Sequence, residues 1–106
     1  MPAVVYSVCA TLPGEELARA YVAWLTEGHA RHIDQVVAGG ASEGSAWREV
    51  GTGGRPRVMA RYVFPSREAF DRYVREVAPA LRAEGLAKFG PQTGVLMERS
   101  VSEVAG

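Results

Sequence analysis

Residues 68–90 carry the pattern that most constrains the fold of this chain. Apolar side chains recur there at three- and four-residue spacing, which predicts one apolar face of an amphipathic helix. The residues of that face are Phe70, Tyr73, Val74, Val77 and Leu81. Pro79 breaks this helix because it lacks an N–H group, and a second helical piece is expected to end at Gly90. A helical unit with one apolar side needs a sheet to cover it.

Four segments have the composition of strands. They are residues 3–10, 41–50, 57–64 and 93–101. Residues 13–40 read as a helix weakened at Gly28 and ended by a glycine pair, residues 51–56 as a hairpin loop, and residues 102–106 as a frayed tail. The order β-α-β-β-α-β predicts a ferredoxin-like α+β fold with an antiparallel sheet, in a single domain spanning residues 1–106.

One face of this sheet is expected to lack a helical cover. Helices pack on only one side of a ferredoxin-like sheet, yet strands 3–10 and 57–64 are apolar on both sides. On the first strand Val5 and Cys9 lie opposite the side of Val4, Tyr6 and Val8. On the second, Met59 and Val63 lie opposite the side of Val58, Tyr62 and Phe64. An uncovered apolar face needs a partner, and a second copy of the same sheet is the simplest one. We therefore expect a homodimer through the sheet face, forming a dimeric α/β barrel.

The composition excludes several classes of partner. Twelve acidic and twelve basic side chains give a net charge of zero, and no basic stripe indicates nucleic-acid binding. No apolar run approaches the roughly 20 residues of a membrane span. The single cysteine, Cys9, cannot form an internal disulfide, and the N-terminus lacks the charged region of a secretory signal, so we expect a cytoplasmic protein. The preference for arginine over lysine is typical of GC-rich bacterial genomes.

The APALRAEGL block of residues 78–86, preceded by YVFPS at residues 62–66, resembles the DUF4286 family, which has no assigned function. The pairs Trp24-Leu25 and His32-Ile33 resemble that family's first-helix signature, although His29 matches the histidine equally well. The resemblance covers nearly the whole chain. It implies a dimeric α/β-barrel-like fold, in a superfamily that includes cofactor-independent monooxygenases, haem-degrading enzymes and stress-response barrel proteins.

His29 and His32 are the candidate catalytic residues. They are three residues apart, which would place them on one helix face, where they could act in acid–base chemistry or bind a metal. A metal would need a third ligand, and only carboxylates such as Glu27 and Asp34 are near in sequence. An exposed polar helix face explains the pair as well, and we predict neither a metal nor a cofactor.

Aromatic residues and one charged strand residue are the candidates for ligand binding. They are Trp24, Trp47, Arg61 and Tyr62. Trp47 is the strongest of them because polar neighbours flank it, as in a mixed ligand site. Arg61 lies on a predicted central strand, so it should pair with Glu49 or Glu98, or face a solvent-filled cavity and bind a substrate carboxylate.

Arg82, beside the Pro79 break, could hold a carboxylate through two hydrogen bonds or tie the short helix to a loop. No nucleophile elbow, zinc-protease motif or CxxC pair occurs in the sequence. We predict a small homodimeric protein that binds a hydrophobic or aromatic metabolite. The alternatives are a cofactor-independent monooxygenase- or cyclase-type enzyme with His29 or His32 as base, and a purely structural interaction module.

Overall fold

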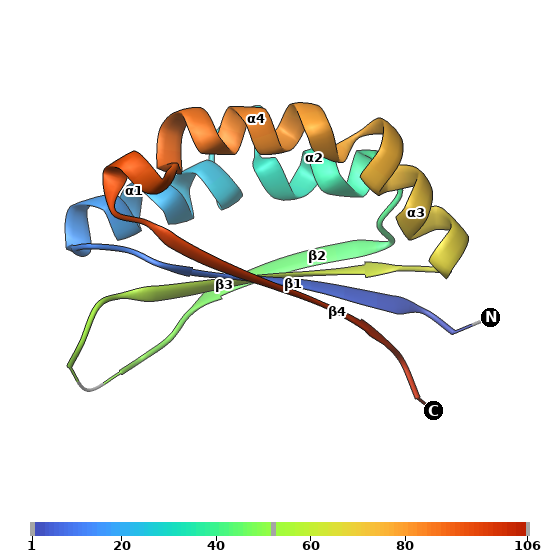
Figure 1. Ribbon diagram of the computed structural model, residues 1–106, viewed down its shortest axis with the longest axis horizontal. Helices are drawn as coiled ribbons and strands as arrows, with labels where there is room; N and C mark the ends of the chain where they lie inside the picture. The colour runs from blue at the N-terminus through green and yellow to red at the C-terminus, as the bar shows by residue number, and fades with distance from the viewer. Residues whose placement is uncertain (1, 52, 106) are drawn as a thin grey trace.

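A computed structural model describes residues 2–51 and 53–105 (Figure 1). The strands are β1 (Val4–Thr11), β2 (Glu43–Arg48), β3 (Arg57–Phe64) and β4 (Leu96–Glu103). The helices are α1 (Glu15–Thr26), α2 (His32–Ala38), α3 (Arg67–Glu76), α4 (Ala78–Phe89) and the short 3₁₀ helix η1 (Pro91–Thr93). This order confirms the predicted ferredoxin-like α+β fold. None of the helices in the described ranges is long and apolar enough to cross a membrane.

The four strands form one antiparallel sheet in the order β2-β3-β1-β4. All the helices lie on one face of this sheet, and no other part of the described chain covers the second face, which we call the bare face (Figure 1). In the register, Tyr6 of β1 lies opposite Tyr62 of β3 and Val101 of β4. Because side chains alternate along a strand, both tyrosines point to the helical face and their neighbours point to the bare face.

The core lies between the sheet and the helices. Its largest fully buried side chains are Tyr62, Phe64, Leu12, Leu25, Val4, Val36 and Val58. In β1 and β3 every second residue is buried, as the predicted alternation requires. On the bare face, Val5, Cys9, Met59 and Val63 remain half-buried within the sheet surface.

Helices α3 and α4 follow the predicted break, with one correction. The Ser66 hydroxyl accepts a hydrogen bond from the Ala69 N–H at 3.1 Å, as expected of an N-cap. The chain changes direction at Val77, and Pro79 lies in the first turn of α4, where its missing N–H costs no hydrogen bond. The prediction that Val74 belongs to the buried face is wrong, because it is 42% exposed. One step from Tyr73 rotates a side chain by about 100°, which carries residue 74 to the outer side of the stripe.

The bounds of other elements also differ from the sequence prediction. The helix expected over residues 13–40 is two helices, because Gly28 takes a φ of 85° and residues 27–31 form a loop. Strand β4 begins at Leu96, after η1, instead of at Thr93.

The tail predicted to fray from Ser102 is instead paired. Ser102 and Glu103 lie opposite Val5 and Val4, since β1 begins at Val4 and its antiparallel partner must run to the same level. Met1, Thr52 in the predicted hairpin loop and Gly106 at the end of the predicted tail lie outside the described residues.

Candidate ligand-binding pocket

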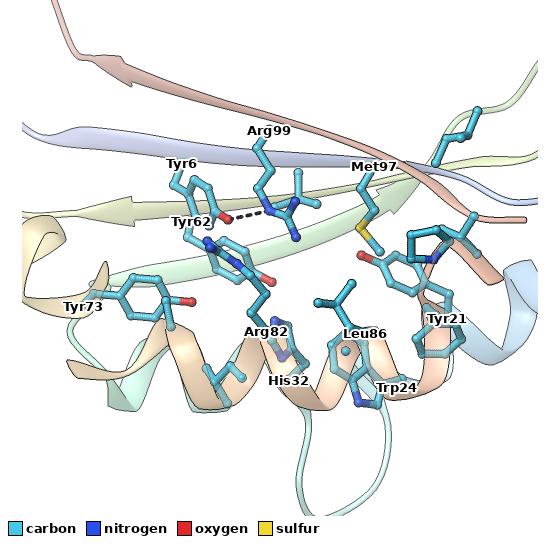
Figure 2. Close-up of a pocket in the computed structure, with 18 residues that line it drawn as sticks. Tyr6, Tyr21, Trp24, His32, Tyr62, Tyr73, Arg82, Leu86, Met97 and Arg99 are labelled. Carbon is cyan, nitrogen blue, oxygen red and sulfur yellow. Dashed lines mark hydrogen bonds between the residues drawn. The ribbon is translucent and has the colours of Figure 1, made fainter. Parts of the chain in front are cut away.

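A cavity of about 330 Å³ lies between the sheet and the helical layer (Figure 2). Buried aromatic rings line much of it: Tyr6, Tyr21, Tyr62, Tyr73 and Phe89. Exposed side chains of α4, η1 and β4 form its rim: Arg82, Leu86, Pro91, Leu96 and Arg99. The mouth therefore lies between α4 and the edge strand β4.

The local structure explains why these side chains face one space. Strand alternation turns Tyr6, Tyr62 and Arg99 toward the helices. On α4 the lining positions recur at helical spacing, and Gly85 is one of them. A Cβ atom at Gly85 would lie 3.3 Å from Cη2 of Trp24, so the glycine lets this indole approach the helix backbone.

Trp24 organises one wall of the pocket. Its ring stacks on the His32 imidazole, with centroids 4.1 Å apart and an interplanar angle of 19°. It also contacts the rings of Tyr21 at 5.8 Å and Phe89 at 5.5 Å. The indole N–H donates a hydrogen bond to Oε1 of Glu84 at 3.3 Å, which satisfies its polar group outside the cavity.

His32 is held as a neutral imidazole. Burial lowers its pKa to about 4, although the nearby Glu84 carboxylate opposes part of this shift. Nδ1 is buried and has no hydrogen-bond partner within the described residues. A neutral imidazole offers one donor and one acceptor, so this group retains hydrogen-bonding capacity at the pocket wall.

Three of the pocket tyrosines, Tyr21, Tyr62 and Tyr73, are held in the protonated form by burial. Burial raises the pKa of Tyr21 and of Tyr73 to about 12, and it also raises the pKa of Tyr62. Tyr6 Oη accepts a hydrogen bond from Arg99 Nε at 3.1 Å. These phenols can therefore act as hydrogen-bond donors toward a molecule in the cavity.

The predicted site residues divide between the two faces of the sheet. His32, Trp24 and Tyr62 line the pocket. Trp47 lies opposite Met59 on the bare face, and the Arg61 guanidinium carbon is 5.5 Å from the centroid of its ring. Because Tyr62 points inward, its neighbour Arg61 must point outward.

Three parts of the sequence prediction are therefore wrong for the single chain. Trp47 does not share a cavity with a first-helix histidine, because the sheet separates them. His29 lies exposed in the loop before α2, so it does not share a helix face with His32. Arg61 does not pair with Glu49, which instead binds Arg57 at 2.9 Å.

Tyr21, Tyr73 and Arg99 also line the pocket, although they were not among the residues predicted for the site. The sequence does single out Arg99, since it shares a strand face with the apolar residues Met97 and Val101. For the tyrosines no local pattern separates a cavity wall from a packed core. Within residues 2–51 and 53–105, no three His, Cys, Asp or Glu side chains form a group that could hold a metal ion.

Several solved structures share this fold. A dimeric ferredoxin-like protein from an uncultured marine organism has a TM-score of 0.81 at 13% identity, over 100% of this chain and 98% of that chain. SnoaB, a cofactor-independent oxygenase from Streptomyces nogalater, has a TM-score of 0.67 at 15% identity, over 100% and 96% of the two chains. An ethyl tert-butyl ether d (ethd) family protein from Bacillus halodurans has a TM-score of 0.71 at 16% identity, over 97% and 99%.

No curated protein sequence matches this chain. The family model described as "Domain of unknown function (DUF4286)" matches residues 3–104, which is nearly the full length. The chain therefore belongs to the DUF4286 family.

Proposed function

We propose that this protein binds a small, flat, largely apolar molecule in the pocket between the sheet and α4. The observation that carries this proposal is a cavity of about 330 Å³ lined by buried aromatic rings, with a stacked Trp24–His32 pair in its wall. Ligand pockets of small-molecule binders begin at about 300 Å³ and combine apolar walls with a few polar groups. A purely structural module would be expected to fill such a space with its own side chains.

Tryptophan fluorescence tests this function, since the two tryptophans lie on opposite faces of the sheet. We expect the neutral aromatic probe N-phenyl-1-naphthylamine to quench Trp24, so titration should change the emission of the Trp47→Phe variant. The matched Trp24→Phe variant keeps only Trp47 and should respond weakly. A response that survives in Trp24→Phe and disappears in Trp47→Phe would place binding outside the pocket and overturn the proposal.

We also propose a homodimer in which the bare sheet faces of two copies pack together. Four half-buried side chains with apolar or sulfur-bearing groups occupy the centre of that face in each copy: Val5, Cys9, Met59 and Val63. Two of the solved structures of similar fold belong to dimeric ferredoxin-like proteins.

We also propose a cytoplasmic location, because the sequence has no second cysteine with which Cys9 could form an internal disulfide.

A second candidate function is a cofactor-independent oxygenase, favoured by the His32 imidazole at the pocket wall, whose buried Nδ1 has no hydrogen-bond partner within the described residues. His32 would accept the proton of a phenolic substrate, and the phenolate would react with O₂. The net reaction converts one phenol and one O₂ into one quinone and one water, so the substrate supplies the electrons. Oxygen consumption with 1-naphthol, lost in His32→Phe but kept in Trp47→Phe, would establish this activity. Absence of consumption by the parent protein would leave the binding function alone.

A further inference from the structure

We infer that the ligand of this pocket is an organic anion, with an apolar body in the cavity and an oxyanion between Arg82 and Arg99. The inference rests on the proposed function, since it names the class of molecule that the pocket takes. Carboxylate and sulfonate groups share the required chemistry: negative charge and several acceptor oxygens.

The two arginines reach the cavity from opposite walls. Arg82 extends from α4 and Arg99 from β4, and Figure 2 shows both guanidinium groups directed into the space between these elements. Within the described residues neither forms an ion pair with a carboxylate. Six other arginines do form such pairs, namely Arg19, Arg31, Arg48, Arg57, Arg67 and Arg75. The positive charge at the pocket mouth is therefore not balanced by carboxylate ion pairs of the described chain.

The lining itself supplies no negative charge. None of the side chains that line the cavity is an aspartate or a glutamate. Two positive groups facing one space repel each other, and an anion between them adds two attractions that outweigh this repulsion. Guanidinium groups also bind oxyanions through directed pairs of hydrogen bonds.

Hydrogen-bond donors gather at the same end of the cavity. The rings of Tyr62 and Tyr73 lie 6.1 and 6.4 Å from the ring of Tyr6, measured between centroids. Tyr6 Oη accepts from Arg99 Nε, which leaves its own proton free to donate. The high pKa of Tyr73, about 12, keeps that hydroxyl protonated, so these three phenols can all offer donors to an acceptor group.

The opposite end of the cavity is apolar. Figure 2 shows Leu86, Met97, Tyr21 and Trp24 on the side away from Arg82. The pocket therefore has a donor-rich, positively charged end and an aromatic end. A molecule that matches both ends is an amphipathic anion with a flat apolar body.

A matched pair of probes tests the inference. 8-Anilinonaphthalene-1-sulfonate carries the same ring system as N-phenyl-1-naphthylamine with one added sulfonate. We expect the parent protein to bind the sulfonate at least tenfold more tightly than the neutral probe, measured as Kd by probe fluorescence. The variant Arg82→Gln/Arg99→Gln should lose this preference, with little change in affinity for the neutral probe. The control Arg55→Gln/Arg72→Gln removes two exposed arginines outside the cavity lining and should keep it.

The outcomes separate the inference from the proposed function. Equal affinity of the parent protein for both probes would overturn the anion inference and leave the binding function intact. Failure of both probes to bind would overturn both. An equal loss in the control variant would show non-specific attraction to net charge and would also overturn the inference. If the double variant does not fold, Arg82→Gln alone decides the matter: Arg82 lies on an exposed helix position, and its loss should still reduce sulfonate affinity severalfold.

Discussion

The imidazole of His32 lies nearly parallel to the indole of Trp24, with 4.1 Å between the ring centroids. This contact links a titratable group to the wall of the pocket. Stacking places one imidazole face against an aromatic ring instead of water, and burial is the main cause of the low pKa of His32. The state of the pocket wall should therefore depend on pH in a defined range.

The stability of the fold should fall as the pH decreases from about 6.5 to about 4. His32 has a pKa of about 4 in the folded protein, against about 6.5 in an unfolded chain. Between these values the unfolded state binds a proton that the folded state does not, so acid favours unfolding by about 3 kcal/mol at pH 4. Urea unfolding at several pH values should measure this slope.

His32→Phe is the matched control for that experiment, since phenylalanine can stack on Trp24 but cannot titrate. The difference in unfolding free energy between the parent and this variant should change steadily across the same pH range. A constant difference would contradict the assigned pKa. Glu15, whose pKa is lowered to about 2 by its hydrogen bonds to Arg48, is present in both proteins and cancels.

Val77→Asp should destabilise the protein far more than Val74→Asp. Val77 packs against the core and next to Gly39, whereas Val74 is 42% exposed. We expect a loss of about 3 kcal/mol for Val77→Asp and less than about 1 kcal/mol for Val74→Asp, because only the first buries an unpaired charge. Denaturant unfolding should measure both, and equal losses would contradict the placement of the helix face.

Gly39→Ala should be destabilising, and shortening Val77 should relieve part of the loss. A Cβ atom at Gly39 would lie 2.8 Å from Cγ1 of Val77, and a branched side chain has little freedom to move. Overpacking of this kind costs about 1–3 kcal/mol. In a double-mutant cycle, Gly39→Ala/Val77→Ala should lose less stability than the sum of the single changes. Gly51→Ala serves as the control, because its Cβ atom would meet only ordinary contacts. If the stability losses of Gly39→Ala and Val77→Ala were strictly additive in the double variant, the predicted steric conflict would be contradicted.

The proposed homodimer predicts a sedimentation mass of about twice the 11.4 kDa chain at micromolar concentration. Val63→Asp places a charge on the bare face of β3 and should yield monomers, because a charge buried in an apolar interface is costly. Val74→Asp adds the same charge to the helical side and should remain dimeric. A monomeric parent protein would remove the basis for sheet-to-sheet assembly.

The sheet could be predicted from the sequence because its signal is local. Alternation in β1 and β3 assigns Tyr6 and Tyr62 to one face and Cys9 and Arg61 to the other, and the structure has these residues on those faces. The same logic placed Trp47 with Ser45 on one side of β2. Alternation does not show which side of a strand the helices cover when both sides of that strand carry polar residues. In β2 the helices cover the side opposite Trp47, so Trp47 does not reach the pocket.

The pocket itself was less predictable, because its mouth lies between two separate elements, α4 and β4. No periodicity within either element shows that Arg82 and Arg99 meet across a cavity. The prediction that His29 and His32 share one helix face is wrong for a different reason. A left-handed backbone conformation at Gly28 opens a loop that leaves His29 in solvent while His32 begins the next helix. Residue spacing predicts a shared face only if the helix continues through both residues.

Because the end of β4 pairs with the start of β1, the order of the elements along the chain could be changed without changing their positions in the fold. The N–H of Val104 donates to the carbonyl of Ala3 at 2.8 Å, so the two ends of the described chain are neighbours, as Figure 1 also shows. A short linker could join them, and new ends could be opened between Gly53 and Gly54, which are exposed in the β2–β3 loop. The resulting circular permutant would start at β3 and end at β2, yet it would retain every pairing of the sheet and both walls of the cavity.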